Sequence, residues 1–170
     1  MHKKRLQIRS IELEKSIFPI IQNYEVVEAI LTDIIKVLEK KNHGDLHLMR
    51  KLKLIPLLIE ICKRVSTCHK HEIKQLGKLL SLVIKIVATF SSIRENRNYM
   101  FHTNRLMPLM ELFSWCLNRT TQVFYGIDFL PNIFLIFTQH LRHRVPYECQ
   151  AMKECIVDLL ISSTITQKLK

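Results

Sequence analysis

The chain has 170 residues, of which 48% are hydrophobic, so it is long enough for one globular domain and too apolar for a disordered segment. With 3 Gly and 5 Pro it has too few turn residues for a sandwich or barrel of short strands, and an all-α fold is expected. The formal net charge of +11 favours an acidic partner, which can be a protein surface, a nucleic acid or an anionic lipid; the alternative interpretation is a basic segment of a longer chain whose other parts balance the charge.

The first elements are predicted in chain order from the N-terminus. Residues 6–15 form a helix with a basic start, and "SIFPIIQN" follows as a short helix or a turn. A strong helix spans about 24–41, because its apolar residues recur at spacings of three and four. Gly44 is expected to end this helix in a left-handed conformation, and Asp45 to cap the next one, "DLHLMRKL".

The same order of elements then starts again. After "KLIPLLIEICKRV" comes a long helix over 71–91, followed by the short "NRNYMFHT" and by "RLMPLMELFSWCLN". A third round is expected from about Gln122 through "YGIDFLPNIFLIFTQHLRH", and a last helix from Pro146, which suits a first helical position.

Pro56 and Pro108 mark equivalent places in the first two rounds. The residues two before and one, two, five and nine after each proline are all apolar and lie on one helix face: Leu54, Leu57, Leu58, Ile61, Val65 and Leu106, Leu109, Met110, Phe113, Leu117. Proline is tolerated in the first turn of a helix and disfavours helical geometry in the residue before it. Each proline is therefore predicted to open a helix directly after a sharp corner.

The segments "HLMRKLKLIPLLIEI" and "ENRNYMFHTNRLMPLMELF" resemble the junction of armadillo repeats, where a short helix leads into one that opens with Leu-Pro. The resemblance implies an armadillo/HEAT-like helical stack, an α-solenoid fragment, with one domain over 1–170 in units of about 1–23, 24–70, 71–121 and 122–170. The interval of 52 between the prolines exceeds the usual repeat of about 40–47. The glycine that often precedes the second helix is also missing, and Leu52-Lys53 and Asn104-Arg105 stand there.

A narrower resemblance is to the carboxy-terminal helical region of the family of S phase cyclin A-associated protein in the endoplasmic reticulum. The stretch "NRNYMFHTNRLMPLMELFSWCLN" carries it. It implies a cytoplasmic adaptor that works in the cell cycle and in ribosome-associated mRNA turnover.

The third helices of armadillo-like stacks line a groove that holds extended peptides, so the resemblance implies that 24–41 and 71–91 are the groove helices. On the later helix four polar residues form one stripe: Lys74, Lys78, Ser81 and Lys85. The corresponding residues of the earlier helix are Glu25, Ala29, Thr32 and Lys36. The functional interpretation is a basic groove for an acidic peptide or a phosphate backbone, and the alternative is an ordinary solvated helix face.

Two further basic groups favour an alternative function, contact with RNA or the ribosome through phosphates. The first group is Arg50, Lys51, Lys53, Lys63 and Arg64, and the second is His140, Arg142, His143 and Arg144. Aromatic residues do not alternate with these charges, so base stacking is not supported, and a solubilising surface is the other interpretation. Trp115 either packs against the next repeat or anchors a partner.

The sequence predicts no catalytic site, cofactor or metal centre. Cys62, Cys68, His69 and His71 are zinc-ligand types, but their spacing is not that of a zinc site. No phosphate-binding glycine loop or nucleophile elbow is present. The expected function is a scaffold or adaptor that binds an acidic protein segment without inserting into a membrane. In the absence of a secretory signal or spanning segment a cytoplasmic location is expected, with the nucleus as the alternative.

Overall fold

The computed structural model describes residues 2–39, 43–64, 72–118 and 130–141, together with Glu154 and Val157. These residues form eight helices and no strand, so the predicted all-α class is confirmed for the described part of the chain. The helices are α1 (His2–Ile17), α2 (Tyr24–Leu38), α3 (His43–Lys51), α4 (Leu54–Lys63), α5 (Ile73–Phe90), α6 (Arg94–His102), α7 (Met107–Asn118) and α8 (Leu130–Leu141).

The prediction for Gly44 and Asp45 is wrong. Helix α2 ends at Leu38 with a right-handed residue after it, and α3 already starts at His43, so both residues lie in the first turn of α3. An acidic residue in a first turn is stabilised by the helix dipole, which makes Asp45 suitable inside the helix as well as at its cap. The helix predicted from Pro146 lies outside the described residues, apart from helical positions 154 and 157.

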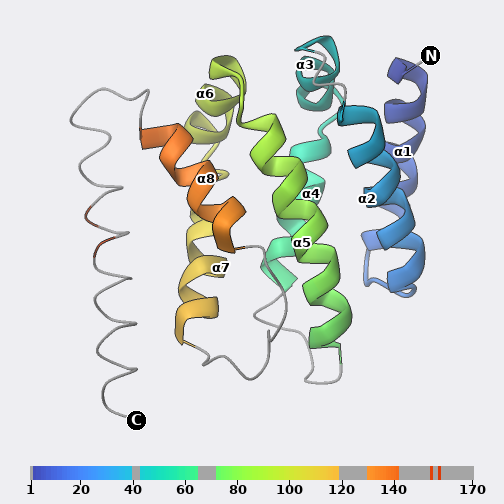
Figure 1. Ribbon diagram of the computed structural model, residues 1–170. Helices are drawn as coiled ribbons and strands as arrows, with labels where there is room; N and C mark the ends of the chain where they lie inside the picture. Colours follow the sequence, from blue (N-terminus) through green and yellow to red (C-terminus); the bar gives the residue numbers. More distant parts are fainter. Residues whose placement is uncertain are drawn as a thin grey trace.

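The helices are arranged in two layers and an end cap (Figure 1). In the view of Figure 1, α2, α5 and α8 lie side by side in front, α1, α4 and α7 lie behind them, and α3 and α6 sit at one end. Helix α5 packs against α2 on one side and α8 on the other, while α4 contacts both α1 and α7. Neighbours within each layer are therefore helices three apart along the chain, which brings distant parts of the sequence together.

The front layer is held by apolar residues that recur at equivalent positions. The intervals are 49 from Leu31 to Leu80 and 53 from Leu80 to Ile133, and all three side chains are buried. One turn later Ile34, Val83 and Ile136 are also buried. Because each set faces the same core, the layer has one continuous apolar interior.

Both prolines lie where the sequence predicts. Pro56 is the third residue of α4 and Pro108 the second residue of α7, so each occupies the first helical turn, where its missing N–H loses no hydrogen bond. The residue at each corner that takes the place of the missing glycine is left-handed: Lys53 and Asn104 both have φ of 54°. The backbone thus adopts the conformation that glycine would favour, without glycine.

The end cap contains a buried polar contact that joins α6 to α3 and α5. Helices α3 and α6 each have nine residues and start 51 positions apart. Asn96 is 0% exposed, and its side-chain amide donates to the carbonyl of Leu46 in α3 at 3.2 Å and to that of Phe90 in α5 at 3.1 Å. This amide joins three helices and satisfies two carbonyl groups that are buried from water.

Candidate functional site

The polar residues predicted on the helix over 71–91 lie together on one side of α5. Lys74, Lys78 and Lys85 are exposed and Ser81 is half-buried between them. We call these four residues the lysine stripe. Helix α5 contains no Asp or Glu. In the part of the chain that the structure describes, no carboxylate lies within ion-pair distance of the three lysines. Their charge is therefore available to a partner.

On α2 the corresponding positions are less basic. Glu25, Ala29 and Lys36 are exposed and Thr32 is half-buried. Lys36 precedes Lys85 by the same 49 residues that separate the buried core positions of the two helices, and α2 packs against α5. Lys36 thus extends the lysine stripe onto the neighbouring helix, whereas Glu25 opposes it at the other end.

The carboxylate of Asp33, on the side of α2 that faces α1, is neutralised by two arginines of α1. Asp33 accepts hydrogen bonds from Arg5 and from Arg9, the latter at 2.7 Å, and its side chain is only 12% exposed. The hydrogen bond from Arg5 is the main cause that lowers the pKa of Asp33 to about 2, against the opposing effect of burial, and Arg9 adds to it. The pair fixes α1 against α2 and leaves no free carboxylate at this position.

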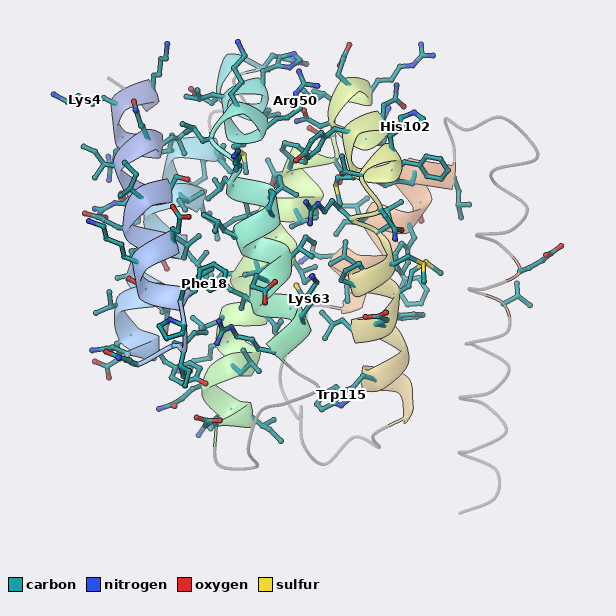
Figure 2. The ribbon with its side chains drawn as sticks, turned by 180° about the vertical axis from the view of Figure 1, so that it is seen from behind. Lys4, Phe18, Arg50, Lys63, His102 and Trp115 are labelled. Atoms are coloured by element: carbon teal, nitrogen blue, oxygen red, sulfur yellow. The ribbon has the colours of Figure 1, made fainter. Side chains whose placement is uncertain are left out.

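The first basic group divides between the two ends of α4. Arg50, Lys51 and Lys53 lie at the corner between α3 and α4. Lys63 is the last residue of the ten-residue helix α4 and Arg64 follows it, about 15 Å from that corner. Figure 2 shows Arg50 at one edge of the molecule, together with Lys4 and His102, and Lys63 well below it. The structure therefore brings three of these five cations together.

Arg64 serves the structure at its end of α4. Its guanidinium donates to the carbonyls of Ile17 at 2.5 Å and Pro19 at 3.1 Å, and it lies 5.9 Å from the centre of the Phe18 ring. Lys63 lies 3.6 Å from Glu60 one turn earlier. These two cations are already engaged within the chain, so they contribute less to a surface for anions than the corner does.

Two basic residues at the second corner were not predicted from the sequence. His102 ends α6 and Arg105 follows it, and this corner lies beside the first because α6 contacts α3 and α7 contacts α4. The signal was present in the sequence, since His102 follows Lys51 by the same 51 residues that separate the starts of α6 and α3. We call the five residues Arg50, Lys51, Lys53, His102 and Arg105 the corner cluster.

The other predicted residues occupy separate places. Trp115 is half-buried and packs against the core from α7, near the bottom of the view in Figure 2. Cys62 is buried in α4, and the three residues predicted near it, Cys68, His69 and His71, lie outside the described ranges. His140 is buried in α8, while Arg142, His143 and Arg144 are also outside.

Among the residues that can be placed, no group of three His, Cys, Asp or Glu side chains could hold a metal ion. None of the described helices is by itself long and apolar enough to span a membrane. Helices α5 and α6 would meet that length and composition together, but the chain bends by 117° between them. Comparison with known proteins found no match to this chain among family models, curated proteins or solved structures.

Proposed function

We propose that this chain is a non-enzymatic scaffold or adaptor with an armadillo/HEAT-like stack of helices, and that its lysine stripe binds an acidic segment of a protein partner. The contacts between helices three apart support the stack, because a three-helix repeat brings equivalent helices into contact in this way. The narrower family resemblance extends the proposal to cytoplasmic cell-cycle or ribosome-associated mRNA regulation.

The observation that carries the binding role is the unbalanced charge of α5. Three lysines at spacings of four and seven residues stand on a helix without a carboxylate. Like charges one turn apart destabilise a helix by roughly 0.2–0.5 kcal/mol per pair, and an acidic partner would relieve that repulsion. Lys36 on α2 lengthens the same basic surface, so a segment that crosses from α5 to α2 meets positive charge on both helices.

Charge reversal tests this assignment. The triple substitution Lys74→Glu, Lys78→Glu, Lys85→Glu should weaken binding of a fluorescent glutamate-rich peptide by about tenfold or more, measured by anisotropy at low salt. The matched control is Lys51→Glu, Lys53→Glu, Lys63→Glu, which changes the net charge equally on other surfaces and should leave the affinity nearly unchanged. Equal losses in both variants would mean that only the overall charge matters, and the assignment would fail.

A second candidate function is contact with RNA or ribosomal phosphates through the corner cluster. It is favoured by the proximity of the two corners, which gathers five basic side chains at one edge of the molecule. For a phosphate-binding surface, affinity for double-stranded RNA should fall steeply between about 50 and 200 mM salt and tolerate changes in sequence. For RNA binding, the triple variant at Lys51, Lys53 and Lys63 should lose affinity, since Lys51 and Lys53 belong to the corner cluster. The triple variant on α5 becomes the control. Pull-downs from cytosol with and without nuclease would separate protein partners from RNA.

A further inference from the structure

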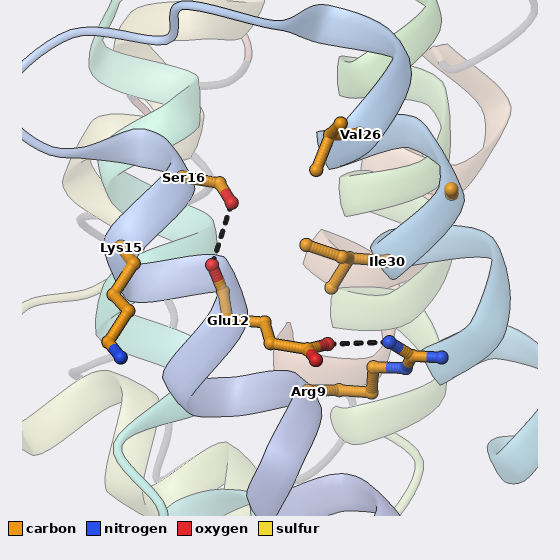
Figure 3. A pocket seen from close by; sticks show the side chains of 7 residues that line it. Arg9, Glu12, Lys15, Ser16, Val26 and Ile30 are labelled. Atoms are coloured by element: carbon orange, nitrogen blue, oxygen red, sulfur yellow. Dashed lines mark hydrogen bonds and ion pairs between the residues drawn. The ribbon is translucent and has the colours of Figure 1, made fainter.

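A groove of about 450 Å³ runs between α1 and α2, beside the basic surface that the proposed function assigns to α5 and Lys36 (Figure 3). Its α1 side is formed by Arg9, Glu12, Lys15 and Ser16, and its α2 side by Val26, Ala29 and Ile30. Val26 is 45% exposed and Ala29 is exposed beside it, whereas Ile30 is nearly buried at the base. The groove therefore has an apolar wall on α2 and a polar wall on α1.

The two walls are fixed relative to each other. Asp33 of α2 is paired with Arg5 and Arg9 of α1, and Arg9 also donates to Glu12 at 2.5 Å. Figure 3 shows the Arg9–Glu12 pair reaching across the groove from α1. A groove whose walls are tied in this way is already formed before a partner arrives, so binding does not have to order it.

The shape of the groove suits a helix. In one common mode of peptide recognition, an amphipathic helix places its apolar side chains in a groove with an apolar wall. Val26, Ala29 and Ile30 stand three and four residues apart, which forms a ridge with a small residue in the middle. A third helix can pack closely against a ridge of this kind.

Exposed apolar side chains concentrate on this part of the molecule. Of the nine large apolar side chains that are exposed in the described residues, five lie in α1, α2 and the connection between them: Ile8, Ile11, Phe18, Ile20 and Val26. Of these five side chains, Val26 lines the groove itself and adds exposed apolar surface to its α2 wall.

The charges around the groove favour an acidic partner. The carboxylate among its lining residues, that of Glu12, is paired with Arg9, and the nearby carboxylate of Asp33 is paired with Arg5 and Arg9. Lys4 and Lys36 are exposed at the end where α1 starts and α2 ends, and Glu39 is exposed there as an opposing charge. Lys15 is exposed on the outer rim at the other end, where Glu25 is the opposing charge. No ion pair engages these three lysines in the ranges that the structure describes.

We propose that the α1–α2 groove binds an amphipathic, acidic helix of a protein partner. Apolar side chains at every third and fourth position of that helix would contact Val26, Ala29 and Ile30. Its carboxylates would lie at the flanks, within reach of Lys15 at one end and of Lys4 and Lys36 at the other. This site is distinct from the lysine stripe on α5, although Lys36 borders both.

Two synthetic helical peptides of about 18 residues test the proposal. Both have leucines along one face, and their flanking residues are glutamate in one peptide and lysine in the other. Binding is followed by NMR of the alanine, valine and isoleucine methyl groups of the full chain. The glutamate peptide should shift the signals of Val26, Ala29 and Ile30 and should bind about tenfold more tightly than the lysine peptide.

Variants locate the site. Ala29→Arg fills the groove from an exposed position and should weaken binding of the glutamate peptide by about tenfold, while Gln7→Arg, an exposed change of the same charge on α1, should not. The triple substitution of Lys74, Lys78 and Lys85 by Glu should leave this binding in place. The proposal is overturned if neither peptide binds, if both bind equally, if Ala29→Arg has no effect, or if the α5 variant abolishes binding. Methyl shifts that follow protein concentration without peptide would show a second copy in the groove and would also overturn it.

Discussion

Counted from the left-handed residue to the proline, the corner between α6 and α7 is one residue longer than the corner between α3 and α4. In the first, left-handed Lys53 stands directly before Leu54, where α4 starts. In the second, Arg105 stands between left-handed Asn104 and Leu106, and its N–H donates to the carbonyl of Met100 at 2.8 Å. That bond and the one from Asn104 to Phe101 at 3.0 Å end α6 in a Schellman-type turn.

The comparison shows what a corner requires. Both corners have one left-handed residue and a proline in the next first turn, but they differ in length, and neither uses glycine. The extra residue does not shift the apolar pattern of α7, because the proline starts the next helix afresh after the corner. Corner geometry therefore depends on backbone conformation and on hydrogen bonds at the helix end, and less on a fixed sequence.

The two end-cap helices, α3 and α6, differ in a buried polar position. Asp45 in α3 and Asn96 in α6 are 51 residues apart, as are the starts of their helices. Asn96 donates to two carbonyls, whereas no such pair of bonds is seen for Asp45 in the described residues. Helix α6 is thus joined to α3 and α5 by a side-chain amide, and the equivalent position of α3 carries Asp45 instead.

The largest effect is expected from Asn96→Asp. The change removes the N–H donor and places a carboxylate beside the carbonyl oxygens of Leu46 and Phe90, so we expect a loss of about 3 kcal/mol in unfolding free energy. Urea denaturation measures it. The matched change Asp45→Asn should cost less than about 1 kcal/mol, since it lies in a first turn and loses mainly a dipole interaction. Equal losses of unfolding free energy in the two variants would contradict the different roles assigned to Asn96 and Asp45.

The second effect concerns how each unit meets the helix before it. Asp33 of α2 pairs with α1, while Leu82 stands at the equivalent position of α5, 49 residues later, and packs against the core. Asp33→Asn should lower the unfolding free energy by about 1–2 kcal/mol at neutral pH, because it removes the charge from two hydrogen bonds to arginines.

This loss should depend on pH with a defined sign. The folded-state pKa of Asp33 is lowered to about 2, below the unfolded value of about 3.9. Its contribution is therefore complete above the unfolded pKa and disappears as the pH falls through the folded one. Denaturation of both proteins at a series of pH values should show their difference in stability shrinking between about pH 4 and pH 2. A difference that stays constant over this range would exclude the ion pair as its source.

The smallest effect is expected from replacing the left-handed residues Lys53 and Asn104 by glycine. Lysine in this conformation costs roughly 1 kcal/mol relative to glycine, whereas asparagine tolerates it better. Lys53→Gly should therefore raise the unfolding free energy by up to about 1 kcal/mol, and Asn104→Gly by only a few tenths. Thermal or urea unfolding of the two single variants checks the order. A loss of stability in Lys53→Gly would show that the lysine side chain matters more than the backbone conformation.

Much of the fold follows from local signals in the sequence. Apolar spacing predicted α2 and α5, and Pro56 and Pro108 predicted the helix starts after the corners. The stripe of Lys74, Lys78 and Lys85 was also found, because exposed residues of a helix recur with the same period as its buried ones.

Other features depend on contacts between distant residues, and the sequence contains no local sign of them. The polar segment "RENRNYMFH" does not show that Asn96 and Arg97 are buried, since their partners are carbonyls outside that helix. The α1–α2 groove depends on ion pairs between residues 24 to 28 positions apart. Gly44 was wrongly predicted to end α2. Glycine often follows the last residue of a helix but does not have to, and here Gly44 lies in the first turn of α3.

The central claim is that helices three apart form parallel layers, with α5 between α2 and α8. The most direct test is a distance measured by double electron–electron resonance between spin labels at Lys36→Cys and Thr138→Cys. These are exposed sites on α2 and α8, and the labels are placed in a chain whose own cysteines are replaced. Two steps of about 8–10 Å between helix axes predict a single narrow distance near 20 Å. A broad distribution, or a distance beyond about 35 Å, would contradict the layered arrangement.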